Sequence, residues 1–132
     1  MNVKNFLISG LCLAFFIGCS TNSPKISKKD SEIYGTYQAT LPCASCEGIE
    51  QVLTLKDNGS YVLQSTYLGE KDGKFIEKGI YNIEKQTITT TNQYKEKNYY
   101  TVKGSNLILL DSEKREATGP LKDLYIFKPY KK

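Results

Sequence analysis

Hydrophobic and polar residues alternate with a period of two along most of the chain beyond residue 33, a pattern typical of half-buried β-strands. The clearest row on one face consists of Tyr61, Leu63, Ser65 and Tyr67. A comparable row just before it consists of Ile49, Gln51, Leu53 and Leu55. Between the rows lies Asp57-Asn58-Gly59, where Asn and Gly accept the positive φ of tight turns. The pattern therefore predicts an antiparallel hairpin over residues 49–67.

The same alternation, divided by further turn signals at residues 71–73 and 103–106, continues to the end of the chain. About eight short strands are expected, at residues 33–39, 49–55, 60–67, 75–83, 87–91, 98–102, 107–111 and 124–128. A single open sheet of so many strands would expose two edges and an apolar face, whereas a barrel pairs the first strand with the last. We therefore predict an all-β fold, a small antiparallel up-and-down β-barrel.

An apolar run at the N-terminus lies outside this pattern. Residues 6–17 are mostly hydrophobic, follow Lys4, and lead into Gly18 and Cys19. A positive residue, a short apolar region and a small residue at the cleavage site are typical of a secretory signal, and the cysteine that follows indicates a lipoprotein. The run is shorter than the ~20 residues that a transmembrane helix needs. We therefore predict a signal peptide at 1–18 and lipidation of Cys19, which anchors the protein to a membrane.

The segment 19–32 is polar apart from Cys19 and Ile26. Because it buries too little apolar surface to offset the entropy of ordering, we expect a flexible tether that leads to one domain at 33–132. The formal net charge of the chain, +4, is distributed among interspersed acids. This charge favours solubility and gives no argument for binding to nucleic acid.

The segment Leu41-Pro42-Cys43-Ala44-Ser45-Cys46-Glu47-Gly48 interrupts the strand pattern, and we expect a loop or a short turn of helix there. Two cysteines three apart can pair as a disulfide, bind a soft metal ion or cycle as a redox couple. Cu(I) accepts two thiolates, whereas zinc requires four ligands and the chain contains no histidine. In an oxidising compartment a structural disulfide is the simplest of these states.

The amino-acid composition gives little support to an enzymatic function. Without histidine, Ser-His-Asp and Cys-His arrangements are excluded. No spacing singles out a pair for acid–base work among the carboxylates Glu47, Glu50, Asp57, Asp72 and Glu77. A thioredoxin-type couple lies at the N-terminus of a helix in a βαβ unit, which the strand pattern does not offer. We therefore expect a protein that is not an enzyme.

The segment 41–49, Leu-Pro-Cys-Ala-Ser-Cys-Glu-Gly-Ile, resembles a block in the N-terminal domain of the NlpE family of copper-resistance and adhesion-sensing lipoproteins. Further matching positions are Leu53, Leu55, Asp57, Gly59, Tyr61, Tyr67-Leu68-Gly69, Gly79-Ile80-Tyr81 and residues 107–111. The resemblance implies a lipocalin-like barrel in which Cys43 and Cys46 form the family's CxxC pair. It also implies that Pro42, Glu47 and Gly48 shape the loop around that pair.

The resemblance further implies a lipoprotein that reports envelope disturbance, copper load or surface contact to the Cpx sensor kinase. Full-length members also contain an OB-fold-like domain with a second cysteine pair, and signalling that depends on that domain is not implied for residues 33–132. In many Gram-negative bacteria an Asp after the lipidated cysteine retains a lipoprotein in the inner membrane. Ser20 therefore indicates an outer-membrane anchor, with the domain facing the periplasm.

The leading hypothesis is thus a non-enzymatic outer-membrane lipoprotein for envelope stress sensing or copper resistance, with the CxxC loop as its sensing site. Two alternatives remain open: a lipocalin-like carrier of a small apolar ligand, and a thiol–disulfide redox protein. The expected cofactors are the covalent lipid on Cys19 and, as an open option, copper on Cys43 and Cys46.

Overall fold

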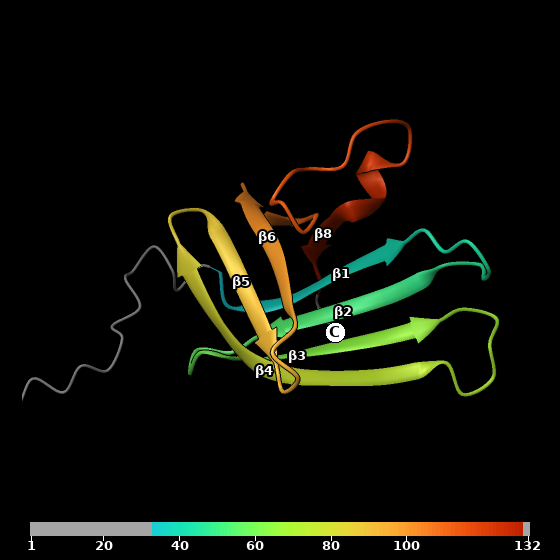
Figure 1. Cartoon of the computed structure of the whole chain (residues 1–132), viewed down its shortest axis with the longest axis horizontal. Helices are drawn as coiled ribbons and strands as arrows, with labels where there is room; N and C mark the ends of the chain where they lie inside the picture. The colour runs from blue at the N-terminus through green and yellow to red at the C-terminus, as the bar shows by residue number, and fades with distance from the viewer. Residues whose placement is uncertain (1–32, 131–132) are drawn as a thin grey trace, which may run out of the picture.

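The computed structural model describes residues 33–130, which form a closed barrel of antiparallel strands (Figure 1). The strands are β1 (Gly35–Leu41), β2 (Ile49–Leu55), β3 (Ser60–Tyr67), β4 (Lys74–Glu84), β5 (Thr87–Asn92), β6 (Lys97–Lys103), β7 (Asn106–Leu110) and β8 (Ile126–Pro129). Each strand pairs with the next in sequence, and β8 pairs with β1. The predicted up-and-down barrel is therefore confirmed. The predicted signal peptide, the tether and Cys19 lie outside the described residues.

Two segments differ from the expectation. A short 3-10 helix, η1 (Lys122–Tyr125), occupies the start of the segment expected to be the last strand, and β8 begins only at Ile126. The helix forms because Gly119 and Leu121 supply carbonyls to the N–H groups of Lys122 and Leu124. The first strand begins at Gly35, two residues later than expected, and Ile33 lies in a turn before it.

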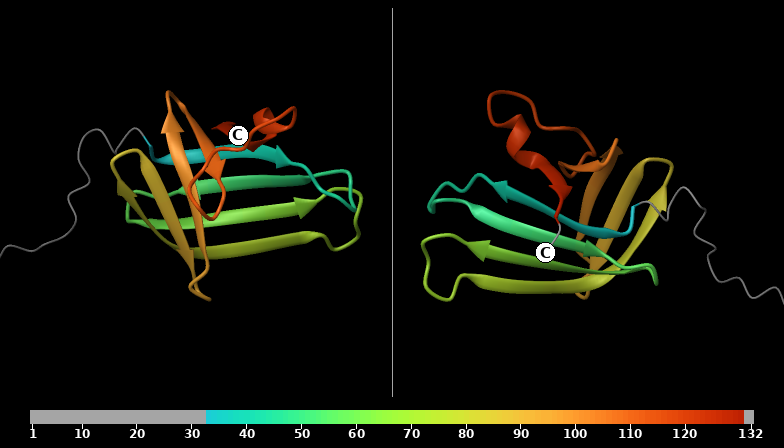
Figure 2. Two further views of the ribbon diagram at one scale, coloured as in Figure 1. Left: turned by 45° about the horizontal axis from the view of Figure 1, so that its top comes forward. Right: turned by 180° about the vertical axis from the view of Figure 1, so that it is seen from behind.

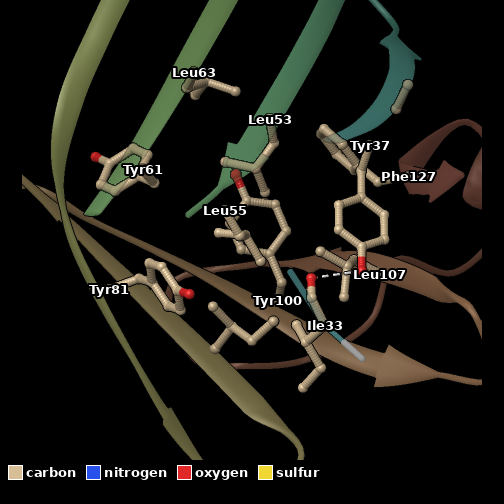
Figure 3. Close-up of a cluster of buried hydrophobic side chains, with 12 residues drawn as sticks. Ile33, Tyr37, Leu53, Leu55, Tyr61, Leu63, Tyr81, Tyr100, Leu107 and Phe127 are labelled. Carbon is tan, nitrogen blue, oxygen red and sulfur yellow. Dashed lines mark hydrogen bonds between the residues drawn. The ribbon is translucent and has the colours of Figure 1, made fainter. Parts of the chain in front are cut away.

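The inward-facing residues of most strands pack into a single core (Figure 3). The side chains with less than 2% exposure are Leu53, Leu55, Tyr61, Ile88, Thr90, Tyr100, Leu107 and Phe127. The rings of Tyr100 and Phe127 meet edge to face with centroids 5.4 Å apart. The Tyr37 hydroxyl donates a 2.7 Å hydrogen bond to the carbonyl oxygen of Ile33, which satisfies a polar group inside this core. The part of the interior that these residues line, called the base of the barrel below, is thus filled by side chains.

The long strand β4 connects two parts of the barrel. Its first half, up to Ile80, pairs with β3, and its second half, from Gly79, pairs with β5. A Cβ at residue 79 would lie only 2.0 Å from the carbonyl oxygen of Thr91, so glycine is required where β5 approaches β4. Beyond this crossing, β3 and the first half of β4 extend past β5 and β6 (Figure 2). The ring of paired strands is closed, but the end of the barrel at the start of β4 is therefore open.

The strand pairing between β1 and β8, which closes the barrel, is short. The paired residues are Tyr37 with Pro129 and Gln38 with Lys128, and η1 packs against β1 beyond them. Between residues 33 and 130, no helix is long and apolar enough to span a membrane.

Candidate functional site

The CxxC loop, residues 42–48, connects β1 to β2 directly after the pair formed by Leu41 and Ile49. Pro42 has no backbone N–H to continue the ladder, so the strand pairing stops there. Residues 44–47 bend without forming a helix. Of the two predicted forms of this segment, the loop is therefore the one observed.

Cys43 and Cys46 are joined by a disulfide bond, with their Cα atoms 5.3 Å apart. Both cysteines are partly exposed, and Ala44 and Ser45 between them are exposed. The Sγ atom of Cys46 lies 3.4 Å from the carbonyl oxygen of Gly48. Because this sulfur is bonded to Cys43 and has no proton, the contact is not a hydrogen bond. Reduction would give the sulfur a proton to donate to this oxygen.

The CxxC loop is bound to the β3–β4 loop, residues 68–73, at the same end of the barrel (Figure 2). The backbone N–H of Leu68 donates a 2.9 Å hydrogen bond to the carbonyl oxygen of Gly48. The side chain of Glu47 lies over Gly69, and its Cδ is 3.3 Å from where a Cβ of residue 69 would be. Glu47 and Gly48, two of the residues expected to shape the loop, thus lie where it contacts the β3–β4 loop.

Gly48 is buried under the loop, where an added Cβ would be crowded. A Cβ at this position would lie 3.1 Å from Thr40 Cγ2, and the backbone φ is 153°, a value that L-residues rarely adopt. Both features favour glycine at the point where the loop returns to β2.

The loop offers two sulfur atoms and no further soft ligand. Within residues 33–130, no group of three or more His, Cys, Asp or Glu side chains is arranged to hold a metal ion. Both sulfurs share a covalent bond, so metal binding requires reduction first. Two thiolates then suit Cu(I), a soft ion that thiolate ligands select.

The setting of the pair differs from that of exchange catalysts. Cys43 and Cys46 lie between two antiparallel strands, and β2 follows the loop instead of a helix. The positive end of a helix dipole, which lowers the pKa of an attacking thiol in thioredoxin-type proteins, is absent from this loop.

A second polar cluster, which the sequence reasoning missed, lies inside the opening of the barrel. The side-chain nitrogen of Asn92 donates to Glu77 at 3.0 Å and to Glu96 at 2.8 Å. The Tyr61 hydroxyl donates to the other oxygen of Glu77 at 2.8 Å. Asn92 also accepts the backbone N–H groups of Tyr94 and Glu96, so it shapes the β5–β6 turn as well. The only sequence signal for this cluster was an Asn and a Glu four residues apart between two strands.

The buried tyrosines near this cluster ionise with difficulty. Burial raises the pKa of Tyr61 and Tyr100 well above the usual range, because the phenolate loses its hydration. The hydrogen bond from Tyr61 to Glu77 and the negative charge of that carboxylate raise the pKa of Tyr61 further.

Fold and site together define a class of protein: a small lipocalin-like barrel domain with a disulfide-closed CxxC loop at one end. Residues 37–120 match the sequence model of the family described as the NlpE N-terminal domain. The chain therefore belongs to the NlpE family, a family of envelope lipoproteins, as its sequence had indicated.

Individual relatives agree with this assignment. The chain is 31% identical over 122 residues to lipoprotein NlpE of Escherichia coli K12, an alignment that covers 84% of this chain and 52% of that protein. The chain thus spans about half the length of this curated relative. A putative lipoprotein from Shewanella oneidensis is 37% identical, with a TM-score of 0.63 over 73% of this chain and 87% of that one. The Cpx pathway activator NlpE from Escherichia coli is 34% identical, with a TM-score of 0.61 over 65% of this chain and 46% of that one.

Proposed function

We propose that this protein senses envelope stress or copper load without catalysing a reaction, and that the Cys43–Cys46 pair is its sensing element. The observation that carries the proposal is the attachment of the loop: Gly48, two residues beyond the disulfide, accepts the hydrogen bond from Leu68. A change in the sulfur pair therefore reaches a second loop directly. The family membership supports the same conclusion.

The sensing step is a two-electron change at sulfur. The reduced pair of thiols gives one electron to each of two Cu(II) ions. The S–S bond forms, both thiol protons leave to solvent, and two Cu(I) ions are released. A dithiol reductant of the envelope returns the pair to thiols by exchange and is itself oxidised to a disulfide. The accessible residues Ala44 and Ser45 leave the pair open to such reagents. The reduced pair also has the ligands to hold Cu(I) as two thiolates.

The disulfide closes a ring of few residues, so it stabilises the fold less than a cross-link over a longer loop would. In the chain-entropy treatment, a loop of this size contributes about 2 kcal/mol. Reduction then frees the loop locally while the barrel core, which does not include the loop, stays intact. The oxidised loop holds Glu47 over Gly69 and the Leu68 N–H at Gly48. The reduced loop weakens both contacts.

The domain would act from a membrane anchor. We propose lipidation at Cys19, attachment to the outer membrane and exposure to the periplasm, which Ser20 favours. A sensor kinase of the envelope stress response is the proposed partner, because a relative is the activator of the Cpx pathway.

The experiment replaces both cysteines, Cys43→Ser with Cys46→Ser, in the lipidated protein in its host cell. A transcriptional reporter of the envelope stress response and growth on copper are the readouts, and circular dichroism of the purified protein checks the barrel. We expect a folded barrel with a lost copper or stress response. The matched control is Ser45→Ala, which alters the same exposed loop and keeps both sulfurs. A double variant that responds as the unmodified protein does would leave the pair purely structural.

A further inference from the structure

The opening of the barrel contains a cavity of about 410 Å³, which we call the mouth cavity. Its walls come from β2 to β6, and the lining residues used below are Ser65, Tyr67, Phe75, Glu77, Tyr94 and Glu96. This volume lies within the range of small-molecule sites. The interior below the cavity is filled by the core, so a ligand would occupy the opening and not the base.

Two carboxylates, those of Glu77 and Glu96, line the mouth cavity. Glu77 and Glu96 come within hydrogen-bonding distance of the same Asn92 nitrogen, which carries no charge. No ion pair in the described part of the chain includes either carboxylate. Lys97, the neighbour of Glu96, lines a separate hollow that also includes Lys114. The site therefore attracts a positive group.

Exposed aromatic rings line the same cavity. Phe75 is 59% exposed, and its ring packs edge to face on Tyr67 with centroids 5.6 Å apart. Tyr94 is 74% exposed and comes from the β5–β6 turn. Rings of this kind cover alkyl chains well, and their faces attract cations. The lining thus combines an apolar wall with carboxylates.

We propose that the mouth cavity binds an amphiphilic amine, an alkyl chain that ends in a primary ammonium group. The alkyl chain lies along Phe75 and Tyr94, and the ammonium group reaches Glu77 and Glu96. Binding of this kind is separate from the thiol chemistry of the CxxC loop, because no cysteine lines the mouth cavity. It also differs from the carriage of a neutral apolar ligand, since the positive charge is required.

The experiment uses a matched series of ligands with one chain length: octylammonium, 1-octanol and octanoate, each kept below its aggregation concentration. The protein is the chain with Cys19→Ser, which removes the predicted lipid attachment and leaves residues 33–132 unchanged. Calorimetry at pH 7 and amide chemical shifts are the readouts. We expect saturable binding of octylammonium with shifts at residues 65, 75 and 94, at least tenfold weaker binding of octanol, and no binding of octanoate.

Substitutions of residues that line the mouth cavity test whether octylammonium binds there. The double change Glu77→Gln with Glu96→Gln should weaken octylammonium binding at least tenfold, because glutamine keeps the shape and removes the charge. Glu84→Gln is the matched control, an exposed carboxylate at the far end of β4. Phe75→Ala should also weaken binding, whereas Ile80→Ala, at an equally exposed position of β4 outside the mouth cavity, should not. Equal affinity for octanol and octylammonium, the absence of binding, or an equal loss with Glu84→Gln would overturn the proposal. If the double variant fails to fold, the ligand series on the otherwise unmodified chain still decides.

Discussion

The backbone N–H of Leu68 and the carbonyl oxygen of Gly48 form a 2.9 Å hydrogen bond that joins two separate loops of the barrel. Gly48 ends the CxxC loop, and Leu68 begins the β3–β4 loop. The two sequence blocks that resemble the NlpE family, around residues 41–49 and 67–69, therefore meet in space. Their pairing gives a physical reason for both motifs to occur in one chain.

Removal of the disulfide should weaken the fold only modestly. We expect Cys43→Ser with Cys46→Ser to lower the free energy of unfolding by about 2 kcal/mol, because the cross-link restricts a short segment of the unfolded chain. Urea denaturation followed by circular dichroism measures this change. Reduction of the unmodified protein with dithiothreitol should produce the same decrease, so a much larger loss in the variant alone would show that the serines disturb the loop in another way.

Replacement of Gly48 by Ala should be more costly than replacement of another glycine with similar backbone geometry. The new Cβ would meet Thr40 Cγ2 at 3.1 Å, and the φ of 153° already disfavours an L-residue. Gly35→Ala is the control, since its φ is 142° and a Cβ there meets nothing within 4 Å. We expect thermal denaturation to show a lower midpoint for Gly48→Ala than for Gly35→Ala. Equal midpoints would mean that the Thr40 side chain moves aside with no loss of stability.

Loss of the Asn92 side chain should destabilise the β5–β6 turn. Asn92→Ala leaves the N–H groups of Tyr94 and Glu96 without their acceptor and removes the donor shared by the two glutamates. Because Tyr94 and Glu96 are exposed, each lost hydrogen bond costs about 1 kcal/mol. Asn82→Ala is the matched control, because Asn82 is exposed on β4. Chemical denaturation of both variants checks the difference, and a stable Asn92→Ala protein would contradict the assigned role.

Stability should fall at high pH because buried tyrosines must ionise on unfolding. Burial raises the pKa of Tyr100 above its ordinary value, so the folded state keeps a proton that the unfolded state loses above about pH 10. The stabilisation is complete below that pH and disappears as the pH rises through the raised folded-state pKa. Urea denaturation at pH 8 and pH 11 measures the fall. Tyr100→Phe should reduce the slope, and an unchanged slope would exclude this tyrosine as a source.

The strands were predictable because a two-residue alternation and turn residues are local signals. Residues 49–55 and 60–67 have the predicted bounds, and the Asp57-Asn58-Gly59 turn joins them. The last strand was predicted too early because Leu121 and Leu124 are three apart and belong to a 3-10 turn. The prediction left the state of Cys43 and Cys46 open, and their spacing alone did not decide between bridging and metal binding.

The polar cluster around Asn92 could not be predicted because Tyr61 and Glu77 are distant from Asn92 in sequence. Glu77 lies on β4 and reaches Asn92 only through the register of β4 with β5, whereas Glu96 is four residues beyond Asn92 in the same turn. Spacing along the chain carries no information about such a meeting. The contact between Glu47 and Gly69 is of the same kind, since it depends on two loops folding to one end of the barrel.

The sensing account is tested most directly by counting free thiols in protein taken from cells by acid trapping, with and without a copper challenge. The count refers to residues 43 and 46, with Cys19 replaced or excluded by mass spectrometry of the peptide. The account predicts a population of reduced pairs before the challenge that converts to the disulfide after it, in step with the stress reporter. A pair that is fully oxidised under every condition, while the reporter still responds, would contradict it.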